Sequence, residues 1–321
     1  MSRHRHATHH RDRSWPPVPL PLGTPAIDDH THLASVVPFS REMARQATER
    51  NMPAVPVYDV DHLLAIAASV GVTQIIDVGC EYPNLSVALE MAKTHPRQVY
   101  TALAIHPNEA VLHGHHGVPG PDGLPVHYEW WHDVSYRDAF DKMAQLVVDN
   151  PGVVVAVGET GLDLFRTGGA GLGLQLCAFR DHIALAKEIG LPMQIHDRDA
   201  HRQVVETLLE DGAPEGTVFH SFSAGPDLAR LANKHGWYLS FSGAVSFKGN
   251  DSIRQALSIA DKRHILVETD APYLTPMPYR GRTNSPYMIP YTLAAMADVL
   301  GMETDGVARL TADNARRLYR I

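Results

Sequence analysis

Histidines are the residues of this chain whose type and spacing point most directly to chemistry. The chain has 321 residues, and 20 of them are histidine. Random placement of 20 histidines would give about 1.2 pairs with the spacing H-x-H, by counting matches to that template. Three such pairs are present: His4/His6, His30/His32 and His113/His115. One pair is therefore a weak signal by itself, and the surrounding pattern must decide which pair binds a ligand.

Metal-capable residues stand at the ends of several short, β-branched runs. His30 and His32 end the first run, and their spacing of two places both side chains on the same side of a strand. Later runs end in Glu159, His196, His220 and Asp270. Imidazole and carboxylate groups are ligands of borderline and hard divalent ions. Six such ligands exceed what one tetrahedral ion requires, which favours two ions sharing a carboxylate and clamping the oxygens of a phosphoryl transfer.

Repeated strand–helix units must position these residues. Eight apolar, β-branched runs alternate with longer stretches of helical period, which is typical of βα units around a parallel sheet. The runs cover residues 26–32, 73–79, 99–107, 153–160, 192–198, 217–222, 238–244 and 264–270. Eight units in a chain of this length predict a (β/α)₈ TIM barrel. An open doubly wound sheet is the alternative, but no G-x-G-x-x-G turn follows the first strand.

Helical period is clearest in two of the intervening stretches, and two insertions break the rhythm. We expect helices over residues 61–70 and 174–189, the second ending at Gly190 as its C-cap. Residues 33–58 follow the first strand and residues 108–137 follow the third. Both insertions leave the strand ends where barrel enzymes keep their active sites. Each is interpreted either as the wall or lid of a substrate groove or as a surface loop.

Composition excludes several classes of protein. The chain has 28 Lys+Arg and 36 Asp+Glu, a formal charge of −8, and 44% hydrophobic residues, which is typical of a globular protein. The acidic balance argues against coating nucleic acid through a broad basic surface. Two cysteines fit a reducing cytosol, so a cytoplasmic location is expected, and no apolar stretch is long enough for a membrane span. We expect a disordered tail rich in His, Arg and Pro over residues 1–24 and a single barrel domain over residues 25–321.

Six ordered blocks carry a resemblance to a known family. They read I-D-D-H-T-H-L, A-I-H-P, V-G-E-T-G-L-D, I-H-D-R-D-A, F-H-S-F-S and V-E-T-D-A-P-Y-L, followed by a closing T-A-D-N-A-R-R-L-Y. Together they resemble the TatD family of metal-dependent deoxyribonucleases, a branch of the amidohydrolase superfamily of barrels. The resemblance runs over residues 25–318. The insertion at 108–137 is longer than this resemblance leads us to expect.

The resemblance implies a role for each metal-capable residue. His30 and His32 match the ligands of the first strand, while His196 and His220 match the ligands of a second metal. Glu159 matches a carboxylate that bridges two metals. Asp270 matches an acidic residue that binds metal and handles the proton of the attacking water. Glu159 and Asp270 are thus the expected catalytic residues, with two divalent ions (Mg²⁺, Mn²⁺ or Zn²⁺) as cofactors.

Three residues are candidates for contact with substrate. His106, in the H-P turn that ends the third run, matches a residue near the substrate phosphate in the resembling family. Arg198 follows His196 closely and suits a phosphate contact, because guanidinium pairs well with phosphoryl oxygens. Arg282 is a weaker candidate of the same kind.

Other polar neighbours have both a supporting and a structural interpretation. Glu268 either orients a ligand or forms a buried ion pair. Asp163 either orients His196 or His106, or caps the following turn. Asp28 is expected beneath the metal site as a hydrogen-bond acceptor. Cys80 and Cys177 are interpreted as core packing.

These observations predict a metal-dependent hydrolase. The expected activity is that of a deoxyribonuclease, resembling a 3′–5′ exonuclease, which cleaves phosphodiesters of DNA or short single-stranded ends through a metal-activated water. The alternatives are a hydrolase of a small ester, an amide or a D-aminoacyl-tRNA, and a non-catalytic metal-binding or nucleic-acid-binding protein. The fourth run offers Glu159 and no lysine, which disfavours relatives that bridge their metals with a carboxylated lysine. No obligate protein partner and no membrane association are inferred.

Overall fold

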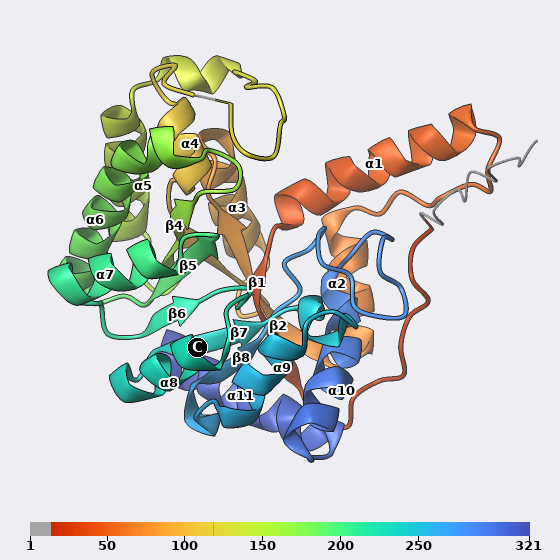
Figure 1. Cartoon of the computed structure of the whole chain (residues 1–321). Coiled ribbons are helices and arrows are strands. Elements are labelled where there is room, and N and C mark those ends of the chain that lie inside the picture. Colours follow the sequence, from red (N-terminus) through yellow and green to blue (C-terminus); the bar gives the residue numbers. More distant parts are fainter. Residues whose placement is uncertain (1–13, 118) are drawn as a thin grey trace, which may run out of the picture.

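Eight parallel strands form the centre of the protein (Figure 1). The computed structural model describes residues 14–117 and 119–321. The strands are β1 (Ala26–Thr31), β2 (Val72–Gly79), β3 (Val99–Leu103), β4 (Val154–Asp163), β5 (Met193–Arg198), β6 (Thr217–Phe219), β7 (Tyr238–Phe241) and β8 (Ile265–Val267). Their spatial order follows the sequence from β1 to β8, and each neighbouring pair is parallel. Each expected run therefore contains a strand.

The segment after β8 closes the sheet against β1. The backbone N–H of Asp270 donates to the carbonyl of His30 at 2.9 Å, and the N–H of His32 donates to the carbonyl of Ala271 at 2.9 Å. These bonds complete the (β/α)₈ TIM barrel that the sequence predicts. Several strands are shorter than expected at their carboxyl ends, so His106, His220 and Asp270 lie just beyond the regular ladder. Their side chains can therefore turn over the rim of the barrel.

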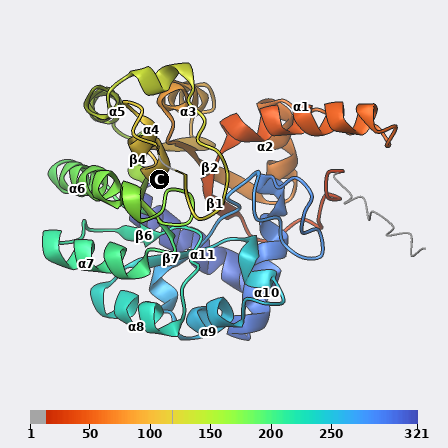
Figure 2. The same cartoon turned by 45° about the horizontal axis from the view of Figure 1, so that its top comes forward.

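Helices form a ring around the strands (Figure 2). They are α1 (Leu33–Glu49), α2 (Val60–Ser69), α3 (Tyr82–Thr94), α4 (Pro107–Leu112), α5 (Tyr136–Asp149), α6 (Leu172–Ile189), α7 (His201–Asp211), α8 (Pro226–His235), α9 (Asp251–Ile259), α10 (Ile289–Leu300) and α11 (Thr304–Tyr319). Short 3₁₀ turns lie at Trp130–Asp133, Gly169–Gly171, Gly243–Ser246, Lys262–His264 and Pro286–Met288. The two expected helices are confirmed as α2 and α6, and Gly190 caps α6 with a φ of +67°. Within the described residues, no helix has the length and apolarity needed to cross a bilayer.

Apolar residues fill both the space between strands and helices and the inside of the barrel. The outer core contains Leu33, Leu85 and Phe179 among many other buried residues. A second cluster joins Ile27 on β1 with the end of α11, where Tyr319 is buried. The final turn of α11 thus packs against the inner residues of the barrel. This packing places the hydroxyl of Tyr319 beneath the rim on which the metal-capable residues lie.

The two insertions fold differently from one another. Residues 33–58 contain the 17-residue helix α1, which projects away from the barrel, despite Pro38 inside it (Figure 1). The carboxylate of buried Asp77 accepts from the N–H of Leu33 at 2.8 Å and so satisfies the start of this helix. Residues 108–137 contain the end of α4, a long irregular segment and the turn Trp130–Asp133. An interpretation of the first insertion as a loop is therefore wrong for its helical part.

Part of the expected disordered tail packs on the barrel. Residues 1–13 lie outside the described residues. Beyond them, the indole N–H of Trp15 donates to the carbonyl of Pro56 at 2.8 Å, and the hydroxyl of Tyr287 donates to the carbonyl of Pro16 at 2.8 Å. These contacts contradict a disordered tail over residues 14–24. The sequence signal for order was Trp15, an aromatic residue able to pack while its N–H finds an acceptor.

One histidine of the barrel wall is structural. His182 on α6 is fully buried; its Nε2 accepts from the N–H of Ile105 at 3.0 Å, and its Nδ1 lies 2.7 Å from the carbonyl of Ala178. Burial lowers the pKa of His182 to about 4, although the bond to Ala178 opposes this shift. The neutral ring thereby anchors the chain immediately before His106.

We expect His182 to make the fold sensitive to mild acid. Its pKa is lower in the folded than in the unfolded chain, so its contribution is complete above about pH 6.5 and is lost as the pH falls towards 4. At pH 5 the loss amounts to about 2 kcal/mol. Denaturant unfolding should therefore show a smaller drop in stability between pH 7.5 and 5 for His182→Gln than for the wild type. Replacement of the exposed His235 by Gln is the control, and equal pH dependence in all three proteins would contradict the assignment.

Candidate metal centre

The six expected metal ligands meet at the carboxyl-end rim of the barrel. His30 lies within β1, Glu159 within β4 and His196 within β5. His32 and His220 follow their strands directly, and Asp270 lies three residues after the end of β8. His30, Glu159 and His220 are buried, whereas the other three side chains are partly exposed towards solvent. The parallel strands thus bring together residues separated by up to 240 positions, as the strand-end pattern predicts.

Close contact between β4 and β5 places Glu159 against its neighbours. Two glycines flank this residue. A Cβ on Gly158 would lie 2.6 Å from the Cβ of Gln194, and a Cβ on Gly161 would lie 2.1 Å from the carbonyl oxygen of His196. Gly161 also has a φ of +137°, a conformation that other residues rarely adopt. The glycines of the V-G-E-T-G block are therefore needed for the approach of the two strands.

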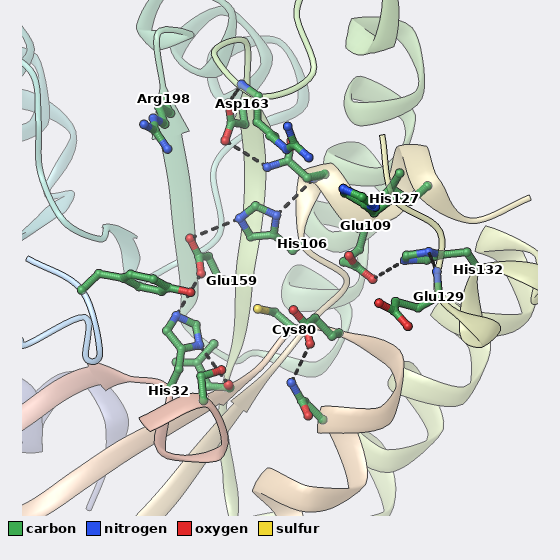
Figure 3. A pocket seen from close by; sticks show the side chains of 18 of the residues that line it. His32, Cys80, His106, Glu109, His127, Glu129, His132, Glu159, Asp163 and Arg198 are labelled. Atoms are coloured by element: carbon green, nitrogen blue, oxygen red, sulfur yellow. Dashed lines mark hydrogen bonds and ion pairs between the residues drawn. The ribbon is translucent and has the colours of Figure 1, made fainter. Parts of the chain in front are cut away.

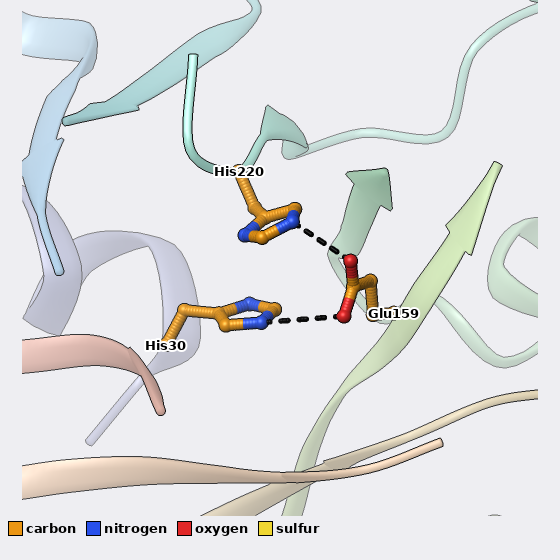
Figure 4. A group of neighbouring side chains, drawn as sticks. All are labelled: His30, Glu159 and His220. Carbon is orange, nitrogen blue, oxygen red and sulfur yellow. Dashed lines mark ion pairs between the residues drawn. The ribbon is translucent and has the colours of Figure 1, made fainter. Parts of the chain in front are cut away.

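The Glu159 carboxylate is the centre of the cluster (Figure 4). Its Oε1 lies 2.5 Å from Nδ1 of His196 and 2.8 Å from Nε2 of His220. Its Oε2 lies 3.6 Å from Nε2 of His30 and 3.5 Å from Nε2 of His32. Each carboxylate oxygen thus faces a different set of imidazoles, and Oε1 also lies 3.6 Å from Nε2 of His106. This division is the arrangement required of a carboxylate shared between two ions.

Two further distances show that the donor set suits cations. Nε2 of His30 lies 3.4 Å from Nε2 of His32, and Nε2 of His32 lies 3.5 Å from Oδ1 of Asp270. Two imidazole nitrogens that face one another need a proton or a metal ion between their lone pairs. The oxygen and nitrogen donors of His30, His32 and Asp270 lie within 4.8 Å of one another, as do those of His30, Glu159 and His220. The residues therefore fit divalent ions, in agreement with the expected cofactor chemistry.

The charges of the cluster are mutually dependent. Burial alone would raise the pKa of Glu159, but the charge of His220 and contacts with His106 and His196 hold it well below its usual value. Burial likewise opposes protonation of His196, yet hydrogen bonds to Asp163 and Glu159 raise its pKa to about 9. The carboxylates therefore draw positive charge onto the rings. A divalent ion would supply that charge and replace the protons.

Asp270 remains ionised in this setting. Burial raises the pKa of Asp270, but the hydrogen bond to His32 and the charge of His220 lower it by more. The pKa of Asp270 is therefore below its usual value. Asp270 also has a positive φ of +52° and lies beside the cavity opening. Its carboxylate is thus an available proton acceptor at the rim.

Each buried ring has a partner behind it. Nδ1 of His30 lies 2.9 Å from the amide oxygen of Gln194, whose NH₂ donates to the carbonyl of Asp29 at 2.7 Å and to the hydroxyl of Tyr319 at 2.9 Å. The Asp29 carboxylate accepts from Tyr319 at 3.0 Å and from Ser240 at 2.6 Å. Such partners fix the orientation of metal-binding imidazoles. The Gln194–Tyr319–Asp29 network does this for His30.

Two of the three expected supporting residues occupy such positions. Oδ2 of Asp163 lies 3.1 Å from Nε2 of His196, and Oδ1 of the same residue accepts from the N–H of Phe165, so both interpretations of Asp163 hold. Oε1 of Glu268 lies 3.3 Å from Nδ1 of His220. Asp28 accepts from the N–H of Thr269 at 2.9 Å, next to Asp270. Asp28 therefore supports the strand end rather than a metal ligand directly.

The expected substrate contacts divide into two that line the site and one that does not. Nε2 of His106 lies 3.6 Å from Oε1 of Glu159. Arg198 is exposed at the cavity, with its guanidinium 4.2 Å from the centre of the Phe165 ring. Arg282 does not line either hollow at the cluster; its guanidinium lies 5.3 Å from the centre of the Tyr279 ring. Contact of Arg282 with substrate therefore stays a prediction.

Two connected hollows open from the cluster. A cavity of about 860 Å³ extends beneath the 108–137 insertion, and a hollow of about 530 Å³ lies on the side of His220 and Asp270. His106, Glu159 and Arg198 line both. The larger cavity, here called the acidic chamber, is lined by Glu81, Glu109, Glu129, Asp122, Asn84, Trp131 and His132 among others (Figure 3). The second insertion is therefore a cavity wall, in agreement with the first of its two interpretations.

Contacts within the chamber hold its carboxylates in place. Oε2 of Glu109 accepts from the indole N–H of Trp131 at 2.9 Å and lies 3.1 Å from Nε2 of His132. Glu81 accepts from the amide of Asn84 at 2.7 Å. Burial and the nearby Glu109 raise the pKa of Glu81. The chamber thus offers fixed acceptors and an indole, and Arg198 lies in the part of its lining that is shared with the second hollow.

Some residues of the site were not identified from the sequence. Gln194 and Tyr319 lie within an apolar strand and a helix, where no polar spacing distinguishes them. Cys80 is 8% exposed and lines the acidic chamber beside His32 and Glu159, although core packing was the interpretation. Cys80 directly follows β2, so the strand-end rule that identified the histidines would have identified it too.

Comparisons with known proteins agree with this geometry. A family model described as TatD-related DNase matches residues 27–320. The chain is 36% identical to an uncharacterized metal-dependent hydrolase TatD of Mycobacterium tuberculosis, over 91% of this chain and 97% of the relative. It is 33% identical to an uncharacterized metal-dependent hydrolase, YabD, of Bacillus subtilis, over 82% and 93% of the two chains. The crystal structure of YjjV, a TatD homologue of Escherichia coli, shares the fold with a TM-score of 0.72 and 24% identity, over 92% and 98%.

We expect added metal to stabilise the protein through Glu159. A divalent ion at 100 times its dissociation constant stabilises the folded state by about 2.7 kcal/mol. Thermal unfolding of chelator-treated protein should therefore shift upwards when Zn²⁺ or Mn²⁺ is added. Glu159→Gln should lose most of this shift, since it removes the negative charge and replaces one of the two oxygens that face the imidazoles by an amide NH₂ group. Glu90→Gln, on the exposed face of α3, should keep it, and an undiminished shift in Glu159→Gln would refute the central position of this carboxylate.

Proposed function

This chain belongs to the TatD family of metal-dependent hydrolases, and from that premise we propose that it is a deoxyribonuclease that removes nucleotides from the 3′ ends of single-stranded DNA. The observation that carries the proposal is the position of the carboxylate-centred histidine cluster. The cluster lies where two hollows meet, and both hollows are lined by Arg198. A phosphodiester at this junction reaches the ligand set and a guanidinium together.

The ligand residues supply what phosphodiester hydrolysis requires. Divalent ions held by His30, His32, His196, His220, Glu159 and Asp270 would acidify a water molecule and neutralise charge on the phosphoryl oxygens. Asp270 accepts the proton of the attacking water, because its carboxylate is ionised and faces the opening. Arg198 binds a non-bridging phosphate oxygen and stabilises the negative charge that develops there. His106, at the same junction, holds the phosphate from the other side.

The acidic chamber supports action at strand ends. Glu81, Glu109 and Glu129 would repel a strand whose phosphates continue beyond the cluster. A terminal nucleoside carries no further phosphate, and its base can stack on Trp131 or bond to the fixed acceptors. The remaining strand then leaves through the hollow lined by Ser221 and Ser223. Cleavage at the junction therefore releases one nucleotide at a time from DNA or short single-stranded ends.

The same chamber favours one second candidate. Its carboxylates also suit a small ester or amide that carries a cationic group, including an aminoacyl ester. In that case the scissile carbonyl, rather than a phosphate, occupies the junction, and Arg198 has no anionic partner. The two candidates differ in their response to substitution of Arg198.

We expect Asp270→Asn to abolish metal-restored DNA cleavage. Loss of a general base typically reduces the rate by about 10²- to 10⁴-fold. Metal-stripped protein should regain stepwise shortening of labelled single-stranded DNA on addition of Mg²⁺, Mn²⁺ or Zn²⁺. Parallel reactions with the label at the 5′ or the 3′ end identify the polarity. Asp313→Asn, on the exposed face of α11, should behave as the wild type.

Three results would count against the nuclease. Cleavage that persists in Asp270→Asn would point to a contaminating enzyme, and immediate loss of a 5′ label would reverse the polarity. No cleavage of DNA together with turnover of a small ester in the same preparation would favour the second candidate.

Arg198→Ala is expected to weaken DNA hydrolysis selectively. Removing one hydrogen bond to a charged group costs about 1.5–3 kcal/mol, equivalent to a roughly 10- to 100-fold fall in kcat/KM. Turnover of a neutral ester should change little. Arg202→Ala is the matched control, because Arg202 lies on α7 and pairs with Glu206 at the surface. Equal losses on DNA and on the neutral ester would exclude a phosphate contact.

A further inference from the structure

Cys80 holds a position that the proposed mechanism does not use. It follows β2 directly, is 8% exposed and lines the acidic chamber together with His32 and Glu159. In Figure 3 its sulfur points towards these two residues. The other cysteine, Cys177, lies exposed on α6 and away from the cluster. The chain therefore has one thiol at the proposed metal centre and one at the surface.

The distances around Cys80 are those of a potential ligand. The sulfur of Cys80, a ring nitrogen of His32 and a carboxylate oxygen of Glu159 all lie within 4.8 Å of one another. Sulfur and nitrogen bound to one tetrahedral Zn²⁺ are about 3.5 Å apart, given bond lengths of about 2.3 and 2.0 Å. Coordination thus requires a movement of at most about 1.3 Å.

Core packing does not account for this placement. Cys80 does belong to a buried apolar cluster that includes Val78 and Ala102. Its sulfur, however, lies within 4.8 Å of donor atoms of two polar residues of the metal cluster, His32 and Glu159. A small hydrophobic residue would fill the apolar side equally well without placing a donor atom there.

We propose that Cys80 is a further ligand of the metal centre and makes it favour a borderline or soft ion such as Zn²⁺ over Mg²⁺. Thiolate sulfur binds Zn²⁺ and Cd²⁺ well, whereas Mg²⁺ prefers oxygen donors and keeps its water. When the ion binds, the thiol proton passes to solvent and one metal–sulfur bond forms, without oxidation or reduction. The inference rests on the proposed metal site, of which His32 and Glu159 are parts.

Spectroscopy of a substituted metal tests this inference without an activity assay. Metal-free wild type, Cys80→Ser and Cys177→Ser are each titrated with Co²⁺ and with Cd²⁺. A thiolate-to-metal charge-transfer band in the near ultraviolet should appear in the wild type and in Cys177→Ser. The band should be missing from Cys80→Ser. Circular dichroism and thermal unfolding of the three proteins check that all are folded, and Cys80→Ala provides a second variant if the serine protein is not.

Affinity measurements give a second readout. Chelator competition should show about tenfold weaker binding of Zn²⁺ and Cd²⁺ by Cys80→Ser than by the wild type. Removal of groups that support a metal site typically weakens metal binding by about 10- to 100-fold, and we expect the lower value. Binding of Mn²⁺ by the same variant should stay within about twofold of the wild type, because Mn²⁺ gains little from sulfur.

The possible outcomes separate the two proposals. Two results would overturn the role of Cys80 and leave the metal site intact. In the first, the wild type binds Zn²⁺ but shows no charge-transfer band. In the second, the band and the affinity are unchanged in Cys80→Ser. A wild type that binds neither Zn²⁺ nor Mn²⁺ overturns the metal site and the role of Cys80 together. A band lost only in Cys80→Ser, with selective loss of Zn²⁺ and Cd²⁺ affinity, supports the inference.

Discussion

The burial of one carboxylate is the constraint on which the rest of the site depends. Glu159 is 4% exposed, and a buried anion is costly unless opposite charge and hydrogen bonds surround it. Here imidazoles from β1, β5 and the end of β6 converge on its two oxygens. Their approach is possible only where parallel strands end together around a closed barrel. Closure of the sheet therefore brings together the imidazoles that stabilise the buried charge of Glu159.

A second layer of groups keeps the rings in place. His30 is oriented by Gln194, His196 by Asp163 and His220 by Glu268. Buried polar networks stabilise a single arrangement only if nearly all their members find partners. The network behind His30 meets this condition by recruiting a hydroxyl from α11 and another from β7. Side chains of α11 and β7, two elements that carry none of the six expected ligands, thus support the residues at the rim.

The ligands were predictable because a simple rule governs them. Polar residues at the ends of apolar runs must lie at one rim if the runs are parallel strands, and no detail of packing is needed to infer this. The same rule says nothing about side chains that reach the site from long loops, so it does not place Arg282. It also says nothing about residues inside buried elements, so Gln194 and Tyr319 were missed. Helix α1 was obscured by Pro38, although Val36, Met43 and Ala47 have the spacing of one buried helical face.

The Tyr319–Asp29 hydrogen bond joins residues that are 290 positions apart in the chain. The ribosome therefore delivers His30 and His32 long before the hydroxyl that supports them. A nascent chain carries the H-x-H pair without Glu159, without its later imidazole partners and without the Gln194–Tyr319–Asp29 network. The network that orients His30 is therefore complete only after Tyr319 has been added to the chain.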